Sequence, residues 1–308
     1  MDRIMRDKKA VVVFLFPAFV LFIAIIIIPL FMTTSYSLTE WDGIGEQKFV
    51  GLEQYIRLLE DDRFMGAVKN TLVFALLSVV IQLPISLLLA LVLSGGIRKG
   101  TRFFLTVYFI PVVISSVVIG QLWRRIYHAD HGLLNILLRA IGFTELGSTP
   151  WLGTMETAFM AVVIPMLWQY IGYHMLLYYS GIRSISPDIY DAAKIDGAGF
   201  WRTTFSITLP LLKPIIQVSL TFAVVGSLRV YDLVRVLTDG GPSGASEVVA
   251  TRMVRIMFYP NLNFGYGSAM AFMLIFVCVL SYFLIWLLFR DRDEIKELRE
   301  KRRLRKHG

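Results

Sequence analysis

The sequence predicts an all-α membrane protein with six transmembrane helices. Hydrophobic residues occupy 56% of its 308 positions and the mean hydropathy is +0.63, whereas soluble domains are about 45–50% apolar. These residues gather in six runs close to the ~20 apolar residues that a helix needs to cross a bilayer. Lys and Arg collect at the ends of the runs, as membrane topology requires. The runs cover residues 11–36, 71–93, 103–123, 158–180, 211–237 and 267–289.

The first and fifth runs need separate justification. The first follows the basic segment MDRIMRDKK, but it extends well past the ~7–15 residues of a signal-peptide apolar region and no small-residue cleavage pattern follows. We therefore expect it to stay as a membrane anchor. The fifth run is interrupted by Arg229, Asp232 and Arg235. These three either pair with one another near the outer end of the helix or line a pathway through the membrane.

The distribution of basic residues predicts the orientation. With the N-terminus inside, 20 of the 31 Lys and Arg residues fall in inner segments and nine in outer segments. Positive charge favours the cytoplasmic side of a membrane, so both termini are expected in the cytoplasm. The inner segments are then residues 1–10, 94–102, 181–213 and 290–308. The last of these is expected to extend the final helix into the cytosol and to anchor the topology.

Two of the outer loops contain helical patterns. FVGLEQYIRLLEDDRF, within residues 39–69, suits a short amphipathic helix at the membrane surface. In GLLNILLRAIG, residues 132–142, leucines recur at helical spacing. Both helices either rest at the interface or dock a partner. The third outer loop contains DGGPSG, residues 239–244, which is a turn signal.

The inner loop 181–213 predicts a short helix over residues 187–195. Ser186 is placed to cap its N-terminus, Pro187 suits the first helical position, and Asp188 lies where the helix dipole favours an acid. Gly197 and Gly199 are expected to end the helix, because glycine accepts the left-handed conformation after a last turn. A second short turn, FWRTTFS, then precedes ITLPLLKP and the return into the membrane.

One side of this helix suits a protein partner. Ala192 and Ala193 leave a thin face that a groove could approach closely, and Asp191 and Lys194 supply orienting charges. The alternative from physical chemistry alone is an amphipathic helix resting on lipid headgroups.

The spacing of the loop resembles a known family. Asp191-Ala-Ala, three residues, Gly197, nine residues and Ile207-x-Leu-Pro210 resembles the EAA loop of permeases in binding-protein-dependent ABC importers, with Asp191 in place of the usual Glu. The resemblance implies a type I importer transmembrane domain (MetI-like) whose EAA helix docks on the ATP-binding subunit. The implied coupling residues are Asp191, Ala192, Ala193, Asp196, Gly197, Ile207, Leu209 and Pro210.

Other segments resemble the carbohydrate-uptake branch of that family. They are FVGLEQYIRLLEDDRF, VYFIPVVISSVVIGQLWRRIY, GLLNILL and VYDLVRVLTDGGP. The last is typical of the larger permease subunit in maltose-type and glycerol-phosphate-type importers. The resemblance implies a cytoplasmic tail (1–10), a first helix (11–36), an outer loop (37–69), a permease domain of five helices (70–289) with coupling loop 181–213, and a basic tail (290–308).

Polar residues at membrane depth predict a solute pathway, since such groups are costly in lipid and usually face a cavity or partner. Aromatic rings stack on sugar rings, and amide, hydroxyl and carboxylate groups bond hydroxyls. In the related maltose permease, sugar contacts align with most of the candidate positions given at the end of this paragraph. The side chain is identical only at Tyr173. Interfacial placement of the tyrosines is the alternative. The candidates are Gln169, Tyr170, Tyr173, Gly226, Ser227, Val230, Tyr231 and Asp232.

The sequence also indicates what this chain lacks. No phosphate-binding GxxxxGK[ST] occurs, so ATP and Mg²⁺ belong on a partner ATPase and no cofactor is expected here. No nucleophile or metal set of an enzyme is found, and His128, His131 and His174 lack a partnered ligand set. The net charge of +8 forms no basic patch with interleaved aromatic residues, which argues against nucleic acid. Cys278 is alone in an apolar run, which excludes a disulfide framework.

The expected function is therefore that of a non-enzymatic permease subunit in a bacterial or archaeal cell membrane. It would pass a carbohydrate, meaning an oligosaccharide, sugar, polyol or glycerol-phosphate, delivered by an extracytoplasmic binding protein. The implied partners are a second homologous permease, two copies of an ATP-binding subunit, the binding protein and membrane lipid. A stand-alone secondary transporter of a small polar solute is the alternative, but it would usually show buried acids, and only Asp232 qualifies.

Overall fold

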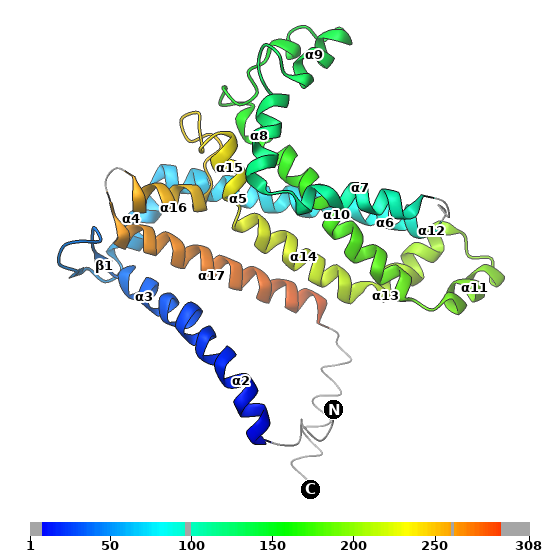
Figure 1. Ribbon diagram of the computed structural model, residues 1–308, viewed down its shortest axis with the longest axis horizontal. Coiled ribbons are helices and arrows are strands. Elements are labelled where there is room, and N and C mark those ends of the chain that lie inside the picture. Colours follow the sequence, from blue (N-terminus) through cyan, green and yellow to red (C-terminus); the bar gives the residue numbers. More distant parts are fainter. Residues whose placement is uncertain (1–7, 96–99, 260–261, 291–308) are drawn as a thin grey trace. The chain divides into compact units, whose positions relative to one another are not determined.

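The computed structural model describes residues 8–95, 100–259 and 262–290 (Figure 1). Most of residues 1–10 and of 290–308, where the two tails are predicted, lie outside the described residues. The described residues are mostly helical and divide into two compact units. Among the described residues, the first unit comprises those within 8–65 and 252–275, and the second comprises those within 66–251 and 276–290.

The predicted spans are present, four of them as nearly unbroken helices. Within the described ranges, these four are long and apolar enough to cross a membrane, and two bent helix pairs bring the number to six if each pair is one span. The prediction of six spans is confirmed if each bent pair counts as one span. The four are Val12–Tyr36, Asp62–Gly95, Ala158–Ser184 and Phe264–Phe289; the pairs are Thr101–Val113 with Ser116–Ile126 and Phe200–Leu211 with Lys213–Leu237.

The third run, predicted as a single span, is a bent pair of helices. It forms α7 (Thr101–Val113) and α8 (Ser116–Ile126), which meet at 99°. Ile114 is extended between them, and the Ser115 hydroxyl accepts a hydrogen bond from the N–H of Val117 at 3.3 Å. A serine that caps the second helix favours a new start over continuation.

The fifth run is also interrupted. Its helix α14 (Lys213–Leu228) ends before Arg229, and α15 (Asp232–Leu237) starts after three non-helical residues. Arg235 forms its ion pair with Asp239, one turn further along. Of the two alternatives for Arg229, Asp232 and Arg235, a pairing of all three along one continuous helix is excluded, because the break separates Arg229 from the helix that carries Asp232 and Arg235.

Prolines account for three widened turns in the described helices. The π-helical turns η1 (Ile23–Ile27), η2 (Ser78–Gln82) and η4 (Thr204–Thr208) each end two residues before a proline. Proline lacks an N–H and its ring collides with the carbonyl four residues earlier. An extra residue in the preceding turn moves that carbonyl aside, which is the usual role of a π-bulge.

The first unit contains α2 (Lys8–Phe22), η1 and α3 (Ile28–Tyr36), followed by a small antiparallel hairpin that the sequence analysis did not predict. In it β1 (Thr39–Glu40) pairs with β2 (Lys48–Phe49). The amphipathic helix predicted next is confirmed as α4 (Glu53–Glu60). Segments later in the chain complete this unit: the end of α16 (Val249–Phe258), which was not predicted, and the start of α17 (Phe264–Phe289).

An ion pair joins these segments inside the first unit. Asp61 accepts hydrogen bonds from Arg252 at 2.6 Å and from the hydroxyl of Tyr266 at 2.8 Å. Burial opposes charge on this carboxylate, but the two hydrogen bonds outweigh it and hold the pKa of Asp61 below its usual value. The carboxylate therefore stays ionised and links the start of α5 (Asp62–Leu77) to α16 and α17.

In the second unit α10 (Ala158–Ser184) is the central helix. It packs against α6 (Leu83–Gly95), α7 and α14, while η2 contacts both α10 and α14 (Figure 1). Gly172 lets α10 approach α7 closely, since a Cβ there would lie 1.8 Å from the Tyr108 carbonyl oxygen. A bulkier residue at this position would push the two helices apart.

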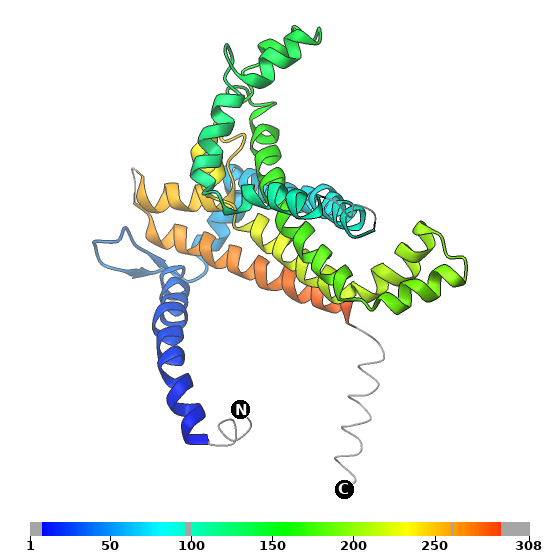
Figure 2. The same ribbon diagram turned by 45° about the vertical axis from the view of Figure 1, so that its right-hand side comes forward.

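Both views show α8 rising away from α6 and α7 toward α9 (Leu133–Ala140), which lies at the far end of this arm (Figures 1 and 2). The prediction of a helix within residues 132–142 is confirmed. The buried side chain of Asn135 donates to the carbonyls of Ala129 and Thr149 and accepts from the indole of Trp151. These bonds connect α9 to the segment that follows the short helix η3 (Leu146–Ser148).

Candidate functional site

A cavity of about 350 Å³ lies inside the second unit. It falls at the small end of the ~300–1,000 Å³ that small-molecule sites occupy. Helices α10 and α14 supply two of its walls, η2 supplies a third, and α7 and α8 contribute Val112 and Ser116. Seven of the eight predicted pathway residues line it: Tyr170, Tyr173, Gly226, Ser227, Val230, Tyr231 and Asp232.

The α10 wall is one helical face. Met166, Tyr170, Tyr173 and His174 follow the spacing of residues on one side of a helix. Tyr173 meets Phe222 of α14 edge to face, with ring centroids 6.1 Å apart. His174 Nδ1 is hydrogen-bonded to the Ser219 hydroxyl at 2.7 Å. The histidine is thus a satisfied core residue, while the tyrosines present aromatic surface to the cavity.

The α14 wall combines space with polar groups. A Cβ at Gly226 would meet no atom within 4 Å, so this position is open. Ser227 is 1% exposed, and its hydroxyl has no hydrogen-bond partner among the described residues. The break after α14 brings Arg229 and Asp232 to the same cavity, so the lining carries one charge of each sign.

Gln169 is the predicted residue that does not belong to the lining. Its side chain is buried and donates to the Ile114 carbonyl at 3.3 Å, at the bend between α7 and α8. Its amide oxygen has no partner among the described residues. The position therefore connects α10 to the bend rather than facing the cavity.

The sequence analysis missed the wall formed by η2. Ser78 and Gln82 line the cavity from this turn, and both are buried. Two polar residues within the apolar run 71–93, followed by Pro84, were the available signal. Ser116, Arg229 and the apolar residues Val112, Met166, Phe222, Ala223 and Leu233 complete the lining.

The predicted coupling helix is present as α11 (Pro187–Ile195). The Ser186 hydroxyl accepts from the N–H of Asp188 at 3.3 Å, and Gly197 is left-handed with φ of 71°, so both predicted ends are confirmed. Gly199 was wrongly predicted to be left-handed. It is extended and precedes α12 (Phe200–Thr203), because the turn at Gly197 already reverses the chain.

Asp191 and Ala192 are exposed on α11, as are Asp196 and Gly197 at its end. Asp191 pairs with Lys194 at 2.8 Å on the exposed face. Of the two alanines predicted to form a thin exposed face, only Ala192 is exposed. Ala193 is 6% exposed and packs inward.

Helices α12, η4 and α13 (Leu209–Leu211) form the return of the loop, and Tyr190 of α11 bonds to Thr208 of η4 at 3.4 Å. Ile207 and Leu209 are half-buried and Pro210 is exposed. The loop also presents large apolar side chains, notably Ile195 at 87% and Trp201 at 65% exposure. Such a surface is unusual unless lipid or a partner covers it.

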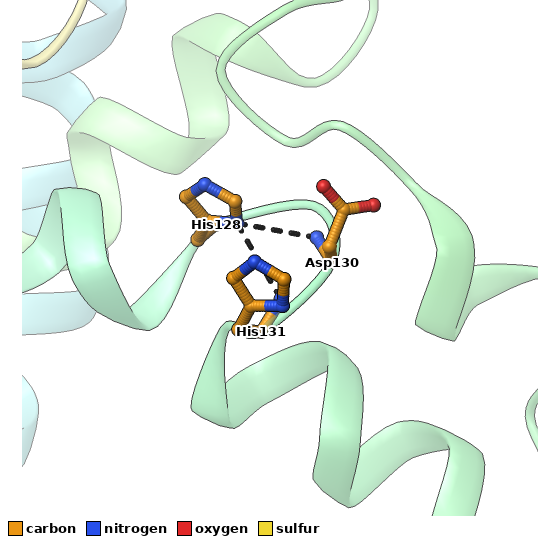
Figure 3. A group of neighbouring side chains, drawn as sticks. All are labelled: His128, Asp130 and His131. Carbon is orange, nitrogen blue, oxygen red and sulfur yellow. Dashed lines mark hydrogen bonds between the residues drawn. The ribbon is translucent and has the colours of Figure 1, made fainter.

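A third group of side chains lies in the loop between α8 and α9. His128, Asp130 and His131 bring potential metal ligands within 4.8 Å of one another, although the sequence analysis had found no partnered ligand set (Figure 3). His128 Nδ1 accepts from the backbone N–H groups of Asp130 and His131 at 3.3 and 3.4 Å. The two imidazole rings are stacked at 12°, so their lone pairs point along nearly parallel planes instead of toward one ion. The geometry is that of a capped turn.

The sequence profile of a family described as "Binding-protein-dependent transport system inner membrane component" matches residues 10–292. The chain belongs to this family. It is a multi-pass membrane protein and the permease subunit of a binding-protein-dependent transport system. Membership decides for the importer and against a stand-alone secondary transporter.

Curated relatives agree over most of their length. A probable ABC transporter permease protein, YurN of Bacillus subtilis (strain 168), is 39% identical over 268 residues, covering 86% of this chain and 91% of the relative. The trehalose/maltose transport system permease protein MalF of Thermococcus litoralis is 34% identical over 283 residues, covering 92% and 94%.

A solved structure shows the same fold. A chain of the bacterial alginate ABC transporter, crystallised in complex with an alginate pentasaccharide-bound periplasmic protein, superposes with a TM-score of 0.81. The match covers 94% of this chain and 96% of the other at 23% identity. The predicted type I importer fold is confirmed.

Proposed function

We propose that this permease passes a carbohydrate, delivered by an extracytoplasmic binding protein, through the cavity between α10, α14 and η2. The observation that carries the proposal is the composition of that cavity. It combines the aromatic rings of Tyr170, Tyr173 and Phe222 with a buried, unpartnered hydroxyl at Ser227. Aromatic faces cover the apolar faces of sugar rings, and a buried polar group without a partner is costly unless a solute supplies one.

The relatives support the same class of solute. Their names include a trehalose/maltose permease and a diacetylchitobiose uptake permease, NgcF of Streptomyces coelicolor. These names describe the solutes of the two relatives. For this chain the proposal extends to the class alone, which is an oligosaccharide, sugar, polyol or glycerol-phosphate.

The same proposal assigns ATP hydrolysis to other subunits. The sequence contains no GxxxxGK[ST], so ATP and Mg²⁺ are bound elsewhere in the complex. The exposed apolar side chains of α11 and α12 supply a docking surface for an ATP-binding subunit. A second homologous permease and two ATP-binding subunits complete the importer, and ATPase closure favours the outward-facing state by binding α11 differently in the two states.

The loop that contains α11 and both termini are assigned to the cytoplasm, on the basic residues counted above. Lys194→Cys in a Cys278→Ser background tests this with an impermeant thiol reagent on intact cells. Labelling is expected only after the membrane is permeabilised. Strong labelling of intact cells contradicts the orientation.

The experiment for transport uses the permease pair, the ATP-binding subunit and the binding protein together in proteoliposomes. ATP-dependent uptake is measured for a panel of labelled saccharides, polyols, amino acids and phosphate esters. Uptake of at least one saccharide or polyol, abolished without ATP or binding protein, is expected. Uptake confined to amino acids or to another non-carbohydrate solute overturns the proposal.

A further inference from the structure

The wall formed by η2 holds a buried amide that is only half bonded. Gln82 is 2% exposed, and its Oε1 accepts a hydrogen bond from the Ser78 hydroxyl at 3.0 Å. An amide side chain offers an oxygen acceptor and two N–H donors. No acceptor for the amide nitrogen occurs among the described residues, and Gln82 lines the cavity. One end of the side chain is thus fixed, and the other is available to a solute.

The π-helical turn explains why this residue faces the cavity. Pro84 follows η2, and the extra residue in the turn relieves its collision with the preceding carbonyl. An extra residue in a turn changes the direction of the side chains relative to a regular α-helix, and Ser78 and Gln82 are the first and last residues of this turn. Turns of this kind recur at functional sites for that reason.

The surroundings indicate which solute group the amide would meet. Because η2 contacts both α10 and α14, Gln82 shares the cavity with Tyr173 and with the unpartnered hydroxyl of Ser227. The charged lining residues are Arg229 and Asp232, one of each sign. The cavity therefore offers neutral hydrogen-bonding groups beside aromatic surface, and no net charge to hold a phosphate or carboxylate.

We infer that Gln82 is a specificity-determining residue that donates a hydrogen bond to a hydroxyl group of a neutral, hydroxyl-rich solute, and that Ser78 positions it. The inference rests on the proposed function and goes beyond it in naming a wall of the cavity and a preference for neutral over anionic solutes. In a purely structural role, the Ser78–Gln82 bond would only stabilise η2, and solute preference would not depend on it.

The test compares the transported sugar with its monodeoxy analogues in the reconstituted importer. Wild type, Gln82→Leu and Gln217→Leu are assayed with the same binding protein, so the preference of the binding protein cancels in each ratio. Gln217 undergoes the same chemical change on α14, but it does not line the cavity. A site that bonds a hydroxyl rejects the analogue that lacks it.

For Gln82→Leu we expect the preference for the parent sugar to fall by about 3- to 10-fold at one hydroxyl position, as loss of one hydrogen bond implies. Gln217→Leu should keep the wild-type ratio at every position. Ser78→Ala should lower the ratio at the same position by a smaller factor. If Gln82→Leu does not accumulate in the membrane, Gln82→Asn, which withdraws the amide by one methylene, gives the same comparison.

The outcomes separate this inference from the proposed function. If wild type transports a saccharide and the Gln82 variants keep every deoxy ratio and the wild-type KM, Gln82 is structural and the inference falls alone. If wild type transports only phosphorylated or carboxylated sugars, the neutral preference is overturned while carbohydrate transport stands. If it transports no saccharide or polyol, both fall.

Discussion

In the cavity of the second unit, polar groups are buried without partners, whereas in the loop of α11 and α12 apolar side chains are exposed to solvent. The Ser227 hydroxyl and the amide nitrogen of Gln82 illustrate the first condition, and Ile195 and Trp201 the second. Each condition is unfavourable for the isolated chain. Each becomes favourable when a particular kind of molecule is added.

The contrast indicates two different occupants. A small hydroxyl-bearing solute satisfies buried hydrogen-bonding groups, and a protein surface covers exposed apolar side chains. The charged pair of Asp191 and Lys194 is exposed and already bonded within α11. It is therefore available to orient a protein partner, while contributing little to the stability of this helix.

The largest expected effect comes from Gly197→Val. Gly197 is left-handed, so a β-branched residue there costs about 1–3 kcal/mol of backbone strain. Strain of that size shifts the equilibrium between a docked and a displaced α11 by roughly 5- to 150-fold. Uptake and the stimulation of ATP hydrolysis by liganded binding protein should both fall.

Gly199→Val is the matched control for this change. Gly199 is extended, and a Cβ there meets no atom within 4 Å. Uptake should therefore stay near wild type. Equal losses in the two variants would mean that side-chain bulk, and not the left-handed turn, disturbs the loop.

The next largest effect is expected for Tyr173→Ala, which removes aromatic surface from the cavity. Loss of an aromatic anchor at a binding surface costs roughly 10- to 30-fold, and here it should lower uptake. Binding-protein-stimulated hydrolysis should persist, since α11 is untouched. Unchanged kinetics across several sugars would place Tyr173 outside the pathway.

Asp191→Lys should have a smaller effect, confined to the loop. Reversing one exposed charge changes an interaction by about two- to fivefold, so stimulated hydrolysis should fall modestly. The double variant Asp191→Lys with Lys194→Asp restores the pair within α11. If the double variant recovers full stimulation, the intrahelical pair matters and the charge does not face the partner.

The smallest effect is expected in the turn between α8 and α9. His131→Ala changes an exposed side chain whose ring lies parallel to that of His128. Surface changes of this kind stay within about twofold, with or without added Zn²⁺. Zinc-dependent uptake that disappears in His131→Ala would show that the cluster binds an ion.

Local chemistry made α11 predictable from the sequence. Ser186 as a cap, Pro187 at the first turn and Gly197 at the end act within a few residues of the helix, so their effect does not depend on the rest of the fold. Gly199 was assigned wrongly because two glycines competed for one left-handed position. The inward packing of Ala193 depends on the return of the loop and was not visible in the spacing.

The breaks in the third and fifth runs and the η2 wall were harder to foresee. Residues 103–123 and 211–237 are apolar enough to continue as helices, so neither the cap at Ser115 nor the break after Leu228 follows from their composition. Gln82 was overlooked because its position on the cavity depends on the widened turn before Pro84. The tyrosines of α10 and Ser227 of α14 were found because polar side chains in apolar runs usually face a cavity, and the resemblance to the maltose permease added Gly226.

Cross-linking from α11 tests the division of roles most directly. In a Cys278→Ser background, a photoactivatable thiol probe is attached at Ile195→Cys, where the native side chain is 87% exposed, and at Leu137→Cys on α9, which is also exposed. In the assembled importer the probe at position 195 should capture the ATP-binding subunit, and the probe at position 137 should not. Capture of the ATP-binding subunit from position 137, or its absence from position 195 in an importer that hydrolyses ATP normally, would contradict the account.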